Sequence, residues 1–106
     1  MKKSEVKKLM KGKLIAVIRN EDPAEAKAIC KTIVESGIDT LEITFSVKNA
    51  EKLIYALKEE LPNALIGAGT VLTKEQAESA YKNGADFIVS PCVVEEVGAY
   101  CKAHDI

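Results

Sequence analysis

Four short apolar segments, separated by helical patterns at nearly constant spacing, constrain the fold of this chain more than any other feature. Their centres lie near Val17, Glu42, Ile66 and Ile88, so consecutive centres are 25, 24 and 22 residues apart. One strand, one helix and two short loops occupy about this length of chain. The alternation predicts an α/β fold with parallel strands and right-handed crossovers. It leaves two architectures open, a small doubly wound sheet and half of a (β/α)₈ barrel.

Residues that start and stop helices divide these units in the expected places. A short amphipathic helix is expected over Ser4–Met10, before the first strand. Asp22 followed by proline is typical of a helix start, and the Thr73–Gln76 segment has the pattern of a capping box. The last of the four strands is expected over Asp86–Ser90. The chain therefore reads as one domain, residues 1–106.

The second strand, Thr40–Phe45, carries a carboxylate where a strand covered on both sides would be apolar. Because side chains alternate along a strand, Glu42 shares one face with threonines and Leu41 shares the other with Ile43. Two structural explanations are open, an edge position in the sheet or hydrogen bonds from the threonines. The functional explanation is an acid/base group that lines a cavity.

Polar side chains gather where the predicted strands end, which is where ligands bind in both candidate architectures. Positive charge, several hydroxyls and the carboxylate of Glu42 suit a small anionic substrate. Alternatively, these side chains are ordinary surface groups at strand ends. The set comprises Arg19 after the first strand, Thr44, Ser46 and Lys48 after the second, Thr70 after the third, and Ser90, Pro91 and Cys92 after the fourth.

Composition excludes several classes of function. Fifteen basic and sixteen acidic residues give a net charge of -1, with no basic block that would bind nucleic acid. No apolar run approaches the roughly 20 residues that a membrane span needs, so we expect no membrane partner and a cytoplasmic location. Three cysteines without a C-x-x-C pair and a single histidine predict neither a disulfide framework nor a metal site.

Four segments, in this order and spacing, resemble the KHG/KDPG aldolases: Ile15–Arg19 (IAVIR), Leu41–Phe45 (LEITF), Ile66–Leu72 (IGAGTVL) and Gly84–Pro91 (GADFIVSP). The resemblance implies a (β/α)₈ barrel, a homo-oligomer that is usually a trimer, and a class I aldolase that needs no metal or other cofactor. It implies a small anionic keto acid as substrate. 2-Keto-3-deoxy-6-phosphogluconate would give pyruvate and glyceraldehyde 3-phosphate, and 4-hydroxy-2-oxoglutarate would give pyruvate and glyoxylate.

The same resemblance assigns roles to individual residues. Glu42 matches the general acid/base, Arg19 matches a basic residue at the mouth of the first strand, and Thr70 and Pro91 match positions that line the pyruvate pocket. The chain departs from some members at Ser46, where they carry an arginine that holds an anionic group of the substrate.

The chain departs from the family more strongly in its length. The family's Schiff-base lysine lies on the sixth strand and its phosphate site follows strands seven and eight, whereas this sequence stops as a fifth strand would begin. We therefore expect the first four βα units of a barrel, with strand order 1-2-3-4. Two functional hypotheses follow: an aldolase by descent that carries only the acid/base half of the site, or a truncated, non-catalytic half-barrel that self-associates.

Overall fold

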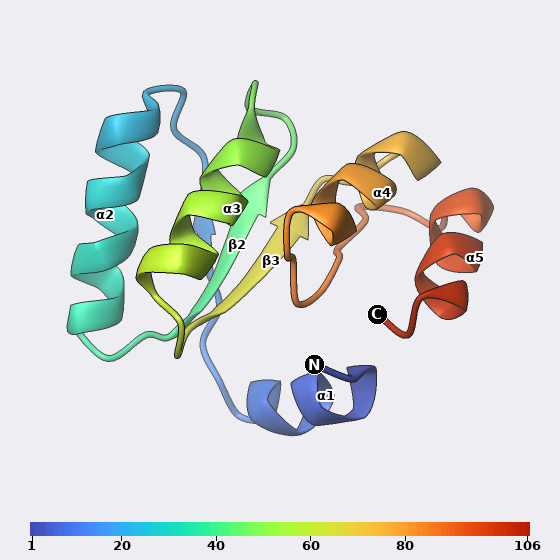
Figure 1. The fold of residues 1–106 in the computed structure, drawn as a ribbon, viewed down its shortest axis with the longest axis horizontal. Helices are drawn as coiled ribbons and strands as arrows, with labels where there is room; N and C mark the ends of the chain where they lie inside the picture. The colour runs from blue at the N-terminus through green and yellow to red at the C-terminus, as the bar shows by residue number, and fades with distance from the viewer.

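A three-stranded parallel sheet forms the centre of the molecule in the computed structural model, which describes residues 1–106 (Figure 1). The strands are β1 (Ala16–Ile18), β2 (Thr40–Thr44) and β3 (Leu65–Gly69), and they lie in the order β1-β2-β3. The helices are α1 (Lys3–Met10), α2 (Pro23–Glu35), α3 (Ala50–Glu60), α4 (Lys74–Lys82) and α5 (Glu95–Ala103). No helix is both long enough and apolar enough to cross a membrane.

The main hydrophobic core lies on one face of the sheet. Leu41 and Ile43 of β2 point to this face and pack with buried residues from α2, α3, α4 and α5, among them Cys30, Ile54 and Tyr100. Figure 1 shows α3 in front of the strands, with α2 beside it. With these four helices sharing one core on one face, the arrangement differs from a doubly wound sheet, which is covered on both faces.

A second, smaller cluster closes the end of the sheet where the strands begin. Val6 and Met10 of α1 pack against Leu65 of β3, Phe87 and Val89. In Figure 1, α1 lies below the start of the strands, and the arrowheads of β2 and β3 point away from it. The ends of the strands that carry the candidate site therefore lie opposite α1.

Two predicted helix starts have the hydrogen bonds that their sequences indicate. The Asp22 carboxylate accepts bonds from the N–H groups of Ala24 (3.0 Å) and Glu25 (3.2 Å). The Thr73 hydroxyl accepts a bond from the Gln76 N–H at 3.1 Å. These caps fix where α2 and α4 begin, and hence the lengths of the loops that follow β1 and β3.

The fourth predicted strand, Asp86–Ser90, is reduced in the structure to an isolated parallel bridge between Ala68 and Ile88. Backbone bonds on either side of this bridge hold the segment beside β3, from the Ala68 N–H to the Phe87 carbonyl (2.9 Å) and from the Val89 N–H to the Ala68 carbonyl (2.8 Å). The structure therefore contains three consecutive strands and a bridged segment rather than four strands.

Side chains replace the missing backbone bonds at both ends of the bridged segment. The Asp86 carboxylate accepts the Ile66 N–H at 2.9 Å, in place of a backbone carbonyl. At the other end Pro91 has no N–H to donate, and the Ser90 hydroxyl bonds to the Val71 carbonyl at 2.8 Å. The sequence pattern of a strand is present, but these two substitutions interrupt its ladder.

We expect Asp86→Ala to lower the free energy of unfolding by about 1–3 kcal/mol, the usual cost of leaving a buried polar group without its partner. The Asp86 side chain is 8% exposed, and it holds both the Ile66 N–H and the Lys58 ammonium, the latter at 2.8 Å. Urea unfolding at neutral pH measures the change.

Asp39→Ala is the matched control. Asp39 also forms an ion pair, with Lys13 at 3.2 Å, but both side chains are 43% exposed, so its loss should cost only about 0–1 kcal/mol. Equal losses in the two variants would contradict the buried role of Asp86.

Candidate functional site

The candidate site is built on the face of the sheet opposite the main core, towards the ends of β2 and β3. Register places Glu42 of β2 level with Gly67 of β3, and Thr44 level with Gly69. A β-carbon added to Gly69 would collide with the Glu42 carboxylate, so this carboxylate lies directly across the Gly69 backbone. A glycine at this position is therefore required for the observed position of Glu42.

Glu42 lies in the middle of the sheet, because β2 pairs with both β1 and β3. Neither of the threonines on its face hydrogen-bonds to its carboxylate: Thr44 is bonded to Ser46 and Thr70, and the buried hydroxyl of Thr40 has no partner. Both structural explanations for a carboxylate in this strand are thus removed. What remains is a partly buried carboxylate whose pKa is raised because burial disfavours its charged form.

A chain of hydroxyl groups lies at the ends of β2 and β3. The Thr44 hydroxyl is 2.9 Å from the Thr70 hydroxyl and 2.9 Å from the Ser46 hydroxyl. Thr44 is fully buried, Thr70 is partly buried and Ser46 is exposed, so the chain runs from the interior of the sheet to solvent. These groups and Glu42 form one polar surface around the glycine.

The other predicted site residues flank this surface. Arg19 follows β1 by one residue; it is exposed and takes part in none of the ion pairs of the structure. Pro91 is also exposed, and it is connected to the end of β3 through the bond of its neighbour Ser90 to the Val71 carbonyl. The structure therefore brings Glu42 and Thr70 onto adjacent strands and leaves Arg19 and Pro91 at either side.

The sequence patterns did not predict two contacts of the site. Gly69 belongs to the Ile66–Leu72 segment, but its place beside the Glu42 carboxylate depends on the register of β2 against β3. Thr44 was predicted only as one of several polar groups at strand ends, and its bond to Thr70 depends on the same register. Because register is a property of the folded sheet, no local pattern indicated either contact.

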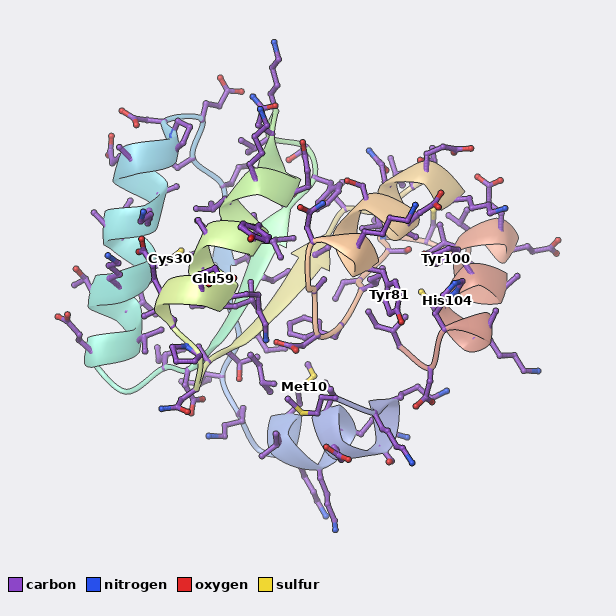
Figure 2. The ribbon with its side chains drawn as sticks, in the orientation of Figure 1. Met10, Cys30, Glu59, Tyr81, Tyr100 and His104 are labelled. Atoms are coloured by element: carbon purple, nitrogen blue, oxygen red, sulfur yellow. The ribbon has the colours of Figure 1, made fainter.

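A cavity of about 560 Å³ lies away from this site, between α1 and the last residues of the chain. Lys2, Glu5, Asp86 and Asp105 line it with opposite charges, together with the aromatic rings of Tyr81 and His104. Figure 2 shows Tyr81, Tyr100 and His104 close together near this end, and the Tyr100 and His104 rings stack with centroids 4.0 Å apart. None of the predicted site residues lines it, so it forms no part of the candidate site.

Groups that could bind a metal are dispersed. Histidine, cysteine, aspartate and glutamate side chains do not gather in threes at any point of the structure. The thiols are free: Cys30 is buried, with its pKa raised to about 11 by burial, and Cys92 is exposed.

We expect Glu42→Gln to become more stable relative to the unmodified chain as pH rises from about 4 to neutrality. The raised pKa means that folding favours the protonated carboxyl group. The stability that Glu42 contributes is thus complete below its unfolded pKa and is lost as pH rises through the folded value. Thermal unfolding midpoints of both proteins, measured across this range, test the difference.

Glu59→Gln removes a carboxylate from α3 and is the control (Figure 2). Its side chain is exposed, so the difference from the unmodified chain should stay nearly constant with pH. A pH-independent difference for Glu42→Gln as well would contradict the desolvation of Glu42.

Comparison with known proteins matches this chain to one family. The family model for KDPG and KHG aldolases covers residues 6–106. A 2-dehydro-3-deoxy-phosphogluconate aldolase of Treponema pallidum is 37% identical over 98 residues, which are 92% of this chain and 47% of the relative. The chain thus spans about half the length of the curated relatives that it matches.

Solved structures agree. The 2-keto-3-deoxy-6-phosphogluconate aldolase of Zymomonas mobilis, crystallised with 3-phosphoglycerate, superposes with a TM-score of 0.84 at 32% identity, over 94% of this chain and 48% of its own. The KDPG aldolase of Legionella pneumophila, with pyruvate captured as a covalent carbinolamine, has a TM-score of 0.78 at 32% identity, over 83% of this chain and 43% of its own. Sequence and structure agree that this chain belongs to the KDPG and KHG aldolase family.

Proposed function

We propose that this chain is a single domain, residues 1–106, that forms the first four βα units of a (β/α)₈ barrel and supplies the acid/base half of an aldolase site. The observation that carries the proposal is Glu42, a carboxylate with a raised pKa at the centre of the sheet, free of threonine partners. A pKa shifted towards neutrality is what general acid/base catalysis requires. The bridged segment after β3 would become the fourth strand of the barrel.

The reaction would be the class I retro-aldol cleavage of a small anionic keto acid. With the keto group held as an iminium ion on an amine, the C3–C4 bond breaks, its electron pair moves into the iminium ion, and Glu42 accepts the proton of the C4 hydroxyl. Thr70 and Pro91 would line the pyruvate pocket, and Arg19 would attract the anionic end of the substrate. Candidate substrates are 2-keto-3-deoxy-6-phosphogluconate, which yields pyruvate and glyceraldehyde 3-phosphate, and 4-hydroxy-2-oxoglutarate, which yields pyruvate and glyoxylate.

The amine is not expected among the four units described here, because the family places its lysine on the sixth strand. The lysines nearest the ends of β2 and β3 are Lys48 and Lys74, and both are exposed. An exposed, solvated lysine lacks the buried surroundings that activate a Schiff-base lysine. Glu42 would thus act on a substrate held by a lysine from the second half of a barrel.

We expect a chimera of residues 1–106 and the second half of the Zymomonas mobilis aldolase to cleave 2-keto-3-deoxy-6-phosphogluconate. Glu42→Gln in this chimera should lower kcat by about 10²–10⁴, the usual contribution of a general acid/base group. Glu59→Gln on the outer surface of α3 should leave kcat unchanged. A coupled assay for pyruvate release measures all three proteins.

Borohydride reduction in the presence of pyruvate, followed by peptide mass spectrometry, locates the amine. The chimera should form an adduct on a lysine of the added half, and the 106-residue chain alone should form none. An adduct at Lys48 or Lys74 of the chain alone, accompanied by pyruvate release from the sugar acid, would contradict the half-site and establish a smaller working enzyme.

A second candidate function is self-association of a non-catalytic half-barrel, and the exposed edge of the sheet favours it. β1 pairs on one side only, and the apolar side chains of Leu14 and Val17 are 74% and 56% exposed. An unpaired apolar edge is a template for another strand. We propose that the 106-residue chain forms homo-oligomers through this edge; a trimer is the usual assembly of the family.

Light scattering at micromolar concentration should therefore give a mass above that of one chain. Val17→Lys places a charge on the exposed edge and should weaken association by about tenfold or more. Tyr55→Lys is the matched control, because Tyr55 is equally exposed, at 56%, but lies on α3. A compact monomer in the unmodified chain would contradict association through β1.

A further inference from the structure

Thr70 has an unusual backbone conformation for its residue type. Its φ angle is 56°, in the left-handed region that β-branched residues rarely occupy. The other non-glycine residues with positive φ are Asn49 and Asp105, whose short polar side chains tolerate this region. Strained residues persist only where their surroundings determine their conformation, and they concentrate at functional sites.

Neighbouring strands fix the backbone on both sides of Thr70. The Gly69 carbonyl accepts the Phe45 N–H at 2.7 Å, and the Val71 N–H donates to the Val89 carbonyl at 3.1 Å. Val71 is also fully buried in the main core. The turn at Thr70 is therefore held between β2 and the bridged segment. These backbone bonds do not fix the rotamer of the Thr70 side chain.

The hydroxyl of Thr44 provides that orientation. It donates to the Thr70 hydroxyl at 2.9 Å, and it accepts the Ser46 N–H at 3.4 Å. The Ser46 hydroxyl, at 2.9 Å, occupies its remaining capacity. Because the Thr70 hydroxyl accepts the hydrogen bond of Thr44, its own hydrogen remains available for another acceptor.

We propose that Thr44 is a positioning residue: it fixes the rotamer of Thr70 and makes the Thr70 hydroxyl a hydrogen-bond donor to the carboxylate of the keto acid. This inference rests on the proposed function for the identity of the ligand. The three hydroxyls form a relay that starts at exposed Ser46, passes through fully buried Thr44 and ends at Thr70. A partly buried, oriented donor of this kind binds an anionic oxygen more strongly than a freely rotating one.

Two measurements on the 106-residue chain test the role of Thr44. Nuclear magnetic resonance couplings that report φ and χ1 of Thr70 measure its positioning without any ligand. Amide shifts of Gly69 and Thr70 during titration with sodium pyruvate, against sodium chloride at equal ionic strength, give the dissociation constant. Thr44→Val, which is nearly isosteric but has no hydroxyl, should average the χ1 couplings of Thr70 and raise the dissociation constant by about tenfold.

Thr40→Val is the matched control, because Thr40 is an equally buried threonine on the same face of β2 whose hydroxyl has no partner. Thr40→Val and Thr44→Ser should both keep the couplings of Thr70 and a dissociation constant within about twofold of the unmodified chain. Unchanged Thr70 couplings in Thr44→Val, or altered ones in Thr44→Ser, would overturn the positioning role. Absence of pyruvate binding to the unmodified chain would instead count against the proposed function, and the couplings would still decide the role of Thr44.

Discussion

The parallel pairing of β2 with β3 determines most of what this molecule presents at its candidate site. In the observed register the large polar side chains of one strand face glycines of the other, Glu42 opposite Gly67 and Thr44 opposite Gly69. A shift of one residue would turn Glu42 into the main core and bury its carboxylate among apolar side chains. The apolar contacts of Leu41 and Ile43 with the helices oppose such a shift, so core packing and site geometry depend on the same register.

Local signals in the sequence predicted the elements whose boundaries are set locally. Asp22 and Thr73 cap helices as their patterns indicate, because a capping bond spans only two or three residues. The fourth strand could not be judged in this way. Asp86 and Pro91 stand at the two ends of an ordinary strand pattern, and only the folded sheet shows that a carboxylate and a hydroxyl replace backbone groups of the ladder there.

Local patterns likewise predicted part of the candidate site but not the contacts between its strands. The alternation of side chains along Thr40–Phe45 placed Glu42 and Thr44 on one face, as observed, and the strand-end rule placed Thr70 nearby. The strained backbone of Thr70 and its bond to Thr44 were beyond prediction, because both arise from contacts between residues distant in sequence. The chain spans about half the length of the relatives that it matches, and β1 pairs on one side only.

The side chains next to the candidate site pack tightly against Gly67. The Phe87 ring occupies the space where a β-carbon at Gly67 would stand, and it packs with Leu65 and with Val6 of α1. Gly67 and Phe87 therefore share one volume, and a larger residue at one position requires a smaller residue at the other. Among homologous sequences this constraint would appear as correlated exchange of residue size between the two positions, which are distant in sequence and adjacent in space.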